Sequence, residues 1–286
     1  MSLRFERYQA LGNDYLVVEG VDWQRWDRPE VARRICDRHF GLGSDGILVR
    51  VGEEPERLRI LNADGSEAEK SGNGLRIFAR YLFDQGRVGE APFAVTTPAG
   101  AVLCRVSAAG AEVEVAMGRM AFASDRIPLA VWAIGDGGRV DDQGRGVLRI
   151  GDRVCEFQAA SIGNPHCAIL VDRAAEVDAR TLGPLIERHP LFPRKTNVQF
   201  LEVVDRRRLR LEIWERGSGY TLSSGSCASA GAAIAKRLGF VDSEVVVVMP
   251  GGEARVTVSD ADDVTLSGPV ARIARLDLAA EFLNSL

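Results

Sequence analysis

The sequence predicts an α/β (α+β) fold with two pseudo-symmetric domains, each a mixed, partly antiparallel sheet wrapped around a central helix. The main observation is an internal repeat. Ser71 and Ser224 each open an apolar, helix-like run, SGNGLRIFARYL and SGSCASAGAAIAKRL, at an offset of 224 − 71 = 153 residues. Similar segments surround both serines: LGNDYLVV matches IGNPHCAILV, and FAVTTPAGAVLCRV matches VVVVMPGGEARVTV. One ancestral unit is therefore present twice.

The chain length agrees with this duplication. A chain of 286 residues is long enough for two domains that each bury a core of their own. We place the boundary near residue 118, which gives domains 1–118 and 119–270. Residues 271–286 are a candidate to return to the first domain and complete it. Residues 135–146 (GDGGRVDDQGRG) are expected to form an exposed loop or hairpin tip, because they are rich in glycine and charge.

In the first half, β-branched and aromatic residues flank a Gly-Asn turn and predict two strands within residues 4–20. Apolar residues at helical spacing predict a helix over 28–40, ended by the glycines of GLGSDG. Strands are expected at 46–51 and 57–61. The segment 62–74 is rich in Gly, Asn and Asp and is expected to be a loop close to a ligand, with the central helix beginning at Ser71.

The second half repeats this order of elements. The expected elements are two strands within 153–172, a helix over 181–189, strands at 197–204 and 208–217, a central helix from Ser224, and a last strand over 262–278.

Composition excludes several classes of protein. The formal charge of −4 gives no broad basic surface, so we expect a small-molecule substrate and no nucleic-acid partner. The N-terminus lacks the apolar stretch of a signal peptide, and no run of about 18 apolar residues is present to cross a bilayer. We therefore expect no membrane association and a cytoplasmic location.

Neither metal nor nucleotide binding is indicated. The five cysteines are odd in number and lack the close paired spacing of a zinc site, so we interpret them mainly as reduced thiols. The three histidines show no metal-ligand spacing. The segments SGNG and SGSC do not provide G-x-G-x-x-G between a strand and a helix. We therefore expect no metal and no cofactor.

The two helix starts are suited to binding an anion. The first N–H groups of a helix lack internal partners, and the aligned peptide dipoles place about half a positive charge there. With Gly72 and Asn73 at one helix and Gly225 and Ser226 at the other, a ligand carboxylate is able to approach both sets of amides. We expect one carboxylate to be shared by both helices.

This arrangement predicts Ser71 and Ser224 as an acid-base pair. Their hydroxyls would flank the carbon next to the shared carboxylate from opposite faces, so that one face loses a proton and the other gains one. The alternative is structural, because serine is a favoured helix N-cap and both hydroxyls would then only bond backbone N–H groups.

The motifs resemble those of diaminopimelate epimerase, a pyridoxal-independent amino-acid epimerase. The matching segments, in chain order, are LGNDY, GLGSDG, NADGSEAE, GNG-x-R-x-FARYL, IGNPH, HPLFPRKTNVQF, WERG-x-G-x-T-L-x-x-G and PGG. The resemblance covers essentially the whole chain. It implies a diaminopimelate epimerase-like fold, a cleft between two domains, no cofactor, a homodimer, and interconversion of LL- and meso-diaminopimelate in lysine and cell-wall precursor synthesis.

The resemblance also implies a set of substrate-binding residues. The positions that match contacts to the distal amino-acid end of diaminopimelate are Asn62, Asn164, Asn197 and Arg216. Glu215 matches a position near the ammonium group of that end, and Asn13 matches another substrate-contacting position. A guanidinium gives a carboxylate two parallel hydrogen bonds, and amides add orientation without charge. Asn62 and Asn164 are also common turn residues in NADG and GNP.

The sequence departs from the family at the reacting groups. Both catalytic positions are normally cysteine, whereas here they are Ser71 and Ser224. A thiol has a pKa near 8.5. If the pKa of a serine hydroxyl is near the water value of about 15.7, it exceeds that of a thiol by roughly seven units. Forming the deprotonated base then costs on the order of 10 kcal/mol more for serine than for cysteine. Helix dipoles supply only about 2 kcal/mol, so an unassisted serine pair is expected to be a poor racemase.

Three further residues leave alternatives open. Lys70 adjoins Ser71 and either activates it or is solvated. Cys227 lies one helical turn after Ser224 and is either a displaced thiol or a packing residue. Tyr220 replaces the family's usual glutamate, which would reshape the cleft or alter specificity. Two other functions therefore stand beside the epimerase: a related isomerase, dehydratase or racemase of another amino or dicarboxylic acid, and a catalytically silent amino-acid-binding paralogue.

Overall fold

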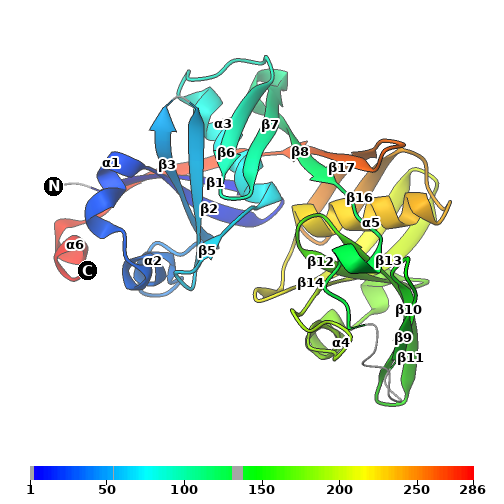
Figure 1. Cartoon of the computed structure of the whole chain (residues 1–286). Coiled ribbons are helices and arrows are strands. Elements are labelled where there is room, and N and C mark those ends of the chain that lie inside the picture. Colours follow the sequence, from blue (N-terminus) through cyan, green and yellow to red (C-terminus); the bar gives the residue numbers. More distant parts are fainter. Residues whose placement is uncertain (1–2, 54, 131–137) are drawn as a thin grey trace. The chain divides into compact units, whose positions relative to one another are not determined.

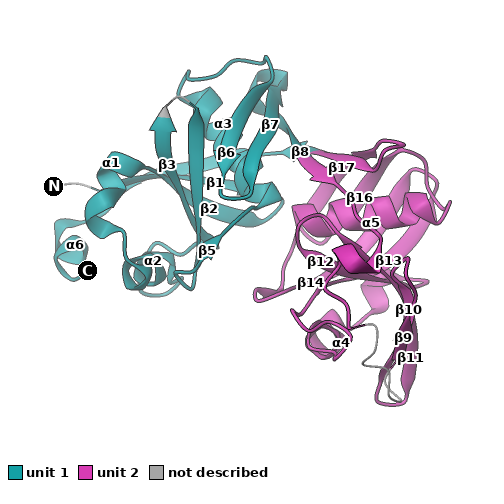
Figure 2. Cartoon of the chain, viewed as in Figure 1, with its two compact units in different colours: residues 1–116, 267–286 teal, residues 117–266 magenta. Residues whose placement is uncertain are grey.

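Residues 3–53, 55–130 and 138–286 are described by a computed structural model, in which the chain forms two compact units (Figure 1, Figure 2). Unit 1 comprises residues 1–116 and 267–286, and unit 2 comprises residues 117–266. The chain crosses from unit 1 to unit 2 in β8 (Glu112–Arg119) and returns in β18 (Asp263–Pro269). The boundary expected near residue 118 thus falls inside β8, and the C-terminal segment belongs to unit 1.

Unit 1 is a mixed sheet packed around helix α3 (Gly72–Asp84). Its parallel pairs are β2 with β3 and β4 with β6, and its other described ladders are antiparallel. The strands are β1 (Arg4–Ala10), β2 (Asn13–Glu19), β3 (Gly46–Glu53), β4 (Glu56–Asn62), β5 (Glu67–Ala68), β6 (Phe93–Thr97), β7 (Gly100–Ser107) and β19 (Ala271–Asp277). The remaining helices are α1 (Gly20–Trp23), η1 (Gln24–Trp26), α2 (Pro29–Cys36), η2 (Ala108–Gly110) and α6 (Ala280–Asn284).

Unit 2 has a corresponding mixed sheet around helix α5 (Gly225–Arg237). Its parallel pairs are β12 with β13 and β14 with β16. The strands are β9 (Gly138–Val140), β10 (Arg145–Ile150), β11 (Arg153–Ser161), β12 (Pro165–Leu170), β13 (Asn197–Asp205), β14 (Arg208–Glu215), β15 (Gly219–Tyr220), β16 (Glu244–Met249) and β17 (Gly252–Val258). The remaining helices are η3 (Ser124–Arg126), η4 (Ala174–Glu176) and α4 (Ala179–Glu187).

The duplication seen in the sequence is present in the pairing of the strands. Adding 153 to the bounds of α3 gives 225 and 237, the bounds of α5. From β1 to β6 and from β11 to β16, successive pairings run antiparallel, parallel, antiparallel and parallel in the same order. The expected α/β (α+β) class, with a mixed sheet around a central helix in each half, is confirmed.

Small residues allow α5 to lie close to its sheet. Between Cys227 and Ala235 the helix is buried and consists mostly of alanine and glycine. A Cβ atom added at Gly231 would lie 3.3 Å from the Leu211 side chain of β14. The close approach buries the backbone near the helix start against the strands that carry the site residues.

Two expected elements differ from the structure. The helix expected over residues 28–40 ends at Cys36, because Asp37 leaves the helical conformation and its carboxylate accepts the N–H groups of His39 and Phe40. The last strand, expected over 262–278, is two strands separated at Val270, because Pro269 has no N–H to continue a ladder.

Other expectations concern loops and cysteines. Residues 138–146 contain the turn of the β9–β10 hairpin, as expected, whereas 135–137 lie outside the described residues. All five cysteines are free thiols, as expected. Within the described ranges, no cluster of three or more His, Cys, Asp or Glu residues is arranged to hold a metal ion. No helix in the same ranges is both long and apolar enough to cross a membrane.

Candidate active site

Ser71 is the N-cap of α3. Its backbone is extended, and its Oγ accepts a hydrogen bond from the Gly74 N–H at 3.0 Å. A Cβ atom at Gly74 would lie 3.2 Å from both Ser71 Oγ and the Leu48 side chain, so glycine allows this contact. Because Ser71 accepts in this bond, its own hydroxyl proton is still able to be donated.

Ser224 is the N-cap of α5 and has a second partner. Its Oγ accepts from the Cys227 N–H at 3.3 Å and donates to Glu215 Oε2 at 2.6 Å. The other carboxylate oxygen of Glu215 accepts from Thr221 Oγ1 at 2.7 Å. Ser224 is only 3% exposed. The N-cap interpretation therefore holds for both serines, but Ser224 also donates to a carboxylate.

The contact between Ser224 and Glu215 changes the chemistry available to the serine. A hydroxyl bonded to a carboxylate at this distance is a charge-assisted donor. When the oxygen of Ser224 takes a proton from a ligand, the hydroxyl proton is able to pass to Glu215 in the same step, so no free alkoxide forms. Sequence reasoning placed Glu215 beside a ligand ammonium group and did not anticipate this contact, because the two residues are nine positions apart in the chain.

Asn197 holds the backbone of Arg216 in place. The carboxamide is 3% exposed, its Oδ1 accepts from the Arg216 N–H at 2.9 Å, and its Nδ2 donates to the Pro165 carbonyl at 3.0 Å. The guanidinium of Arg216 is exposed and donates to the Arg194 carbonyl at 3.3 Å. Asn197 thus links the ends of three segments and leaves the charged group of Arg216 at the surface of unit 2.

Asn164 is oriented by a buried histidine. His166 has no exposed surface, and burial, followed by the nearby charge of Arg216, lowers the pKa of His166 to about 3. The ring is therefore neutral: Nε2 donates to Asn164 Oδ1 at 3.0 Å, and Nδ1 accepts from Gln199 Nε2 at 2.6 Å. This network fixes the oxygen end of the Asn164 carboxamide.

The two other predicted asparagines lie in unit 1. Asn13, at the start of β2, donates to Asp45 Oδ2 at 2.7 Å. Asn62, at the end of β4, donates to Ser66 Oγ at 2.9 Å, and its backbone closes the turn to the same residue. Asn62 is thus a turn residue, as one interpretation of the sequence held. The side chains of Asn13 and Asn62 are both half-buried.

The remaining predicted residues form the two helix starts. Gly72 and Asn73 are buried at the first two positions of α3, and Gly225 and Ser226 occupy the same positions of α5. At the α5 start, the structure links one further predicted residue to the capping serine, Glu215 through its bond with Ser224.

Lys70, Cys227 and Tyr220 each have a defined environment. Lys70 is half-buried, and this burial lowers its pKa. Cys227 is fully buried, which raises the pKa of its thiol far above the ordinary value, so it is a packing residue and not a displaced thiolate. Tyr220 donates to Glu212 Oε2 at 2.9 Å, and its ring lies 4.0 Å from the Arg180 guanidinium.

Sequence reasoning missed one charged residue at the α3 start. Arg76 is 1% exposed, and its Nη2 donates to Asn73 Oδ1 at 2.6 Å. Burial lowers its pKa to about 10, so the guanidinium is charged at neutral pH. The sequence offers two signals: Arg76 is the arginine of the GNG-x-R motif, and it stands on the otherwise apolar face of an amphipathic helix.

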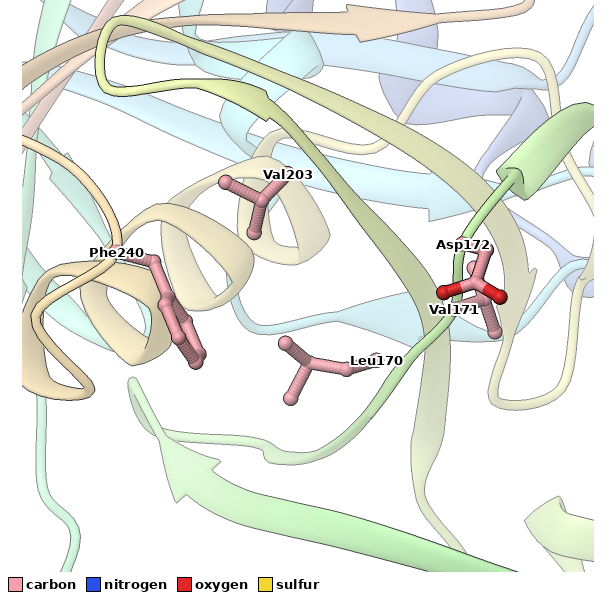
Figure 3. Close-up of a pocket in the computed structure, with 5 residues that line it drawn as sticks. All are labelled: Leu170, Val171, Asp172, Val203 and Phe240. Carbon is pink, nitrogen blue, oxygen red and sulfur yellow. The ribbon is translucent and has the colours of Figure 1, made fainter.

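A surface hollow in unit 2 contains none of the predicted site residues (Figure 3). It is lined by Leu170, Val171, Asp172, Val203 and Phe240, so that Asp172 is the one titratable side chain among the five. This hollow offers no acid-base pair, and we do not assign it to the reaction.

Comparison with known proteins identifies the family of the chain. The family model described as diaminopimelate epimerase matches residues 5–123 and 158–273. The chain is 46% identical to diaminopimelate epimerase 2 of Nostoc sp., over 98% of this chain and 96% of the relative. It is 39% identical to diaminopimelate epimerase of Desulfitobacterium hafniense, over 93% and 95% of the two chains.

Solved structures support the fold. A hydroxyproline epimerase from Agrobacterium vitis has a TM-score of 0.68 at 15% identity and covers 98% of this chain and 93% of its own. A predicted epimerase from Pseudomonas aeruginosa has a TM-score of 0.66 at 19% identity, with 97% and 99% covered. The family match and the full-length relatives together show that the chain belongs to the diaminopimelate epimerase family.

Proposed function

We propose that the protein is an isomerase that interconverts LL- and meso-diaminopimelate by cofactor-independent proton transfer at the α-carbon. The observation that carries this proposal is the 2.6 Å contact between Ser224 Oγ and Glu215 Oε2. It supplies the base that a serine lacks by itself. The identities of 46% and 39% to full-length diaminopimelate epimerases support the choice of substrate.

In the proposed step, the α-proton of the substrate moves to Ser224 Oγ while the Ser224 hydroxyl proton moves to Glu215 Oε2. Ser71 gives its hydroxyl proton to the opposite face of the same carbon. Ser71 is half-buried, so water is able to replace its proton as it leaves, and Glu215 returns its proton to water. In the reverse reaction each transfer runs backwards: Ser71 Oγ takes the α-proton and its hydroxyl proton passes to water, while Ser224 protonates the opposite face and receives a proton from protonated Glu215.

The proposed recognition follows the chemistry of each group. The reacting carboxylate is bound by the helix-start N–H groups of Gly72, Asn73, Gly225 and Ser226. The distal end is held by the exposed guanidinium of Arg216, with the carboxamides of Asn62, Asn164 and Asn13 as neutral contacts. Asn197 contributes by fixing the Arg216 backbone, since both ends of its carboxamide bond backbone groups.

Isotope exchange tests the proposal. Native protein incubated with LL-diaminopimelate in D2O should incorporate deuterium at the α-carbon and form the meso isomer. The double variant Ser71→Cys with Ser224→Cys, which restores the family's usual pair, should epimerise faster. Absence of exchange by both proteins would contradict the proposed activity. Binding without exchange would identify a silent amino-acid-binding paralogue.

A second candidate is an isomerase or racemase of another amino or dicarboxylic acid. It is favoured by Tyr220, which stands where the family usually has glutamate. Its hydroxyl donates to Glu212, and its ring lies against the Arg180 guanidinium. A substrate with a more acidic α-proton would also place a smaller demand on serine. A panel of amino and dicarboxylic acids in D2O separates the candidates, because the true substrate should exchange at least tenfold faster than diaminopimelate if this alternative holds.

We also propose a cytoplasmic homodimer. A biosynthetic isomerase that acts on a free amino acid fits the reducing environment implied by five free thiols. Light scattering on the purified protein should give twice the 31.0 kDa mass of the chain. A mass equal to one chain over the working concentration range would contradict the dimer.

A further inference from the structure

Arg76 is a buried cation that makes no ion pair among the described residues, although the charge of Glu112 acts on it. It is the fifth residue of α3 and is 1% exposed. One guanidinium nitrogen donates to Asn73 Oδ1, whereas Nε and Nη1 have no hydrogen-bond partner in the described part of the chain. Burying a guanidinium is unfavourable unless negative charge compensates it. The charge of Glu112 compensates only in part, because burial still lowers the pKa of Arg76 to about 10. The helix thus retains a cation that a bound anion would stabilise further.

The repeat makes the placement of this charge specific to unit 1. Adding 153 to 76 gives Ser229, which is fully buried and neutral and donates to the Gly225 carbonyl at 2.8 Å. Unit 2 instead places the carboxylate of Glu215 on its capping serine. The two helix starts therefore carry opposite charges: a cation near Ser71 and an anion next to Ser224.

The contact with Asn73 also fixes the direction of a carboxamide. A guanidinium is only a donor, so the end of the Asn73 side chain that faces Arg76 must be its oxygen. The amino group therefore points away from the guanidinium. A carboxamide held in this direction is suited to donate to a carboxylate at the helix start.

We infer that Arg76 is a positioning residue for the proposed epimerase reaction. It orients Asn73 toward the reacting carboxylate, and its buried charge stabilises the negative charge that develops on that carboxylate and on Ser71 Oγ as protons move. A charge fixed in a site without water acts more strongly than one in solvent and needs no reorganisation. This inference rests on the proposed function, and it explains why unit 1 carries a charge that unit 2 lacks.

Arg76→Met is the main test, and Arg105→Met is its control. Arg105 is an exposed arginine of β7 in the same unit, so the control removes an equal charge at the surface. For Arg76→Met we expect kcat to fall about 10- to 100-fold, the range typical of residues that support a site from behind. The KM should change less than about threefold, since the charge acts mainly on the transition state. Arg76→Lys should recover part of kcat.

A native kcat per folded molecule in Arg76→Met would overturn the inference, as would a rise in KM with unchanged kcat. If Arg76→Met does not fold, the test uses Arg76→Lys alone and in an Asn73→Ala background. If Arg76→Lys no longer lowers kcat once Asn73 is alanine, the inference is supported. If the two substitutions lower kcat independently, so that their effects add as free energies, the inference is overturned. If the native protein shows no exchange, the proposed function itself fails, which is a separate outcome from equal rates in native protein and variant.

Discussion

Replacing Glu215 with glutamine should remove the base while keeping the shape of the site. The carboxylate accepts from Ser224 Oγ at 2.6 Å and from Thr221 Oγ1 at 2.7 Å. In Glu215→Gln the carbonyl oxygen still accepts one of these hydroxyls, but the carboxamide takes up no proton at neutral pH. The variant therefore separates proton acceptance from positioning.

The expected loss follows from the role of a positioned base. General base catalysis typically contributes about 10²- to 10⁴-fold, which corresponds to about 3–5.5 kcal/mol of barrier. The lost charge-assisted hydrogen bond accounts for about 1.5–3 kcal/mol in the ground state. We expect the α-hydrogen exchange rate of Glu215→Gln at saturating LL-diaminopimelate to fall by about 10²- to 10⁴-fold.

The assay is the initial rate of deuterium incorporation in D2O, followed by NMR, with circular dichroism to confirm folding. Glu212→Gln is the matched control, because Glu212 lies on the same strand and accepts a hydroxyl, from Tyr220 at 2.9 Å. Combining Glu215→Gln with Ser224→Ala should cost little more than either change alone, since the two groups act as one unit. A Glu215→Gln rate within threefold of native would refute the role of the carboxylate.

Four other perturbations have defined outcomes. Gly74→Ala adds a Cβ 3.2 Å from Ser71 Oγ, so exchange should fall at least about tenfold while the free energy of unfolding changes by about 1 kcal/mol or less; native exchange in this variant would show that Ser71 is not held by that contact. Burial lowers the pKa of His166 to about 3 in the folded protein, whereas an unfolded histidine takes up a proton below about pH 6.5. The unfolded state therefore binds one more proton than the folded state between these pH values. The free energy of unfolding should fall by about 1.4 kcal/mol for each pH unit from about pH 6.5 toward pH 3. His166→Gln should lose this dependence in acid titrations, and equal slopes would contradict it. Asn197→Ala leaves two backbone groups without their partners and should lower the free energy of unfolding by about 2–4 kcal/mol and raise KM, as measured by urea titration and kinetics; an unaltered KM would exclude a role in holding Arg216. Iodoacetamide at pH 8 should leave exchange within twofold of native, because burial raises the pKa of Cys227; inactivation traced to modification of Cys227 would oppose this.

The fold was predictable because the repeat in the sequence corresponds to a repeat in the helices and strands. The offset of 153 residues found from Ser71 and Ser224 also relates the bounds of α3 and α5. Patterns of apolar residues predicted the strands on either side. The end of α2 was missed, because the capping of His39 and Phe40 N–H groups by Asp37 depends on a local turn that periodicity does not report.

Sequence reasoning selected candidate residues for the site but did not predict the contacts between them. Helix-start chemistry indicated the serines, and family motifs indicated Glu215 and Arg216. The bond from Ser224 to Glu215 depends on how the β14–β15 turn brings the two together. The burial of Arg76 was also beyond sequence reasoning, because arginines on helices usually extend to solvent and only packing decides otherwise.

The most direct measurement compares inversion of LL-diaminopimelate by Ser71→Ala and Ser224→Ala, with chiral chromatography of the product and mass spectrometry of α-deuterium. Removing either hydroxyl takes away the proton acceptor or donor on one face, so each variant should lose at least about 10³-fold in the rate of meso formation while keeping a native circular dichroism spectrum. Formation of the meso isomer at the native rate by either variant would contradict the account.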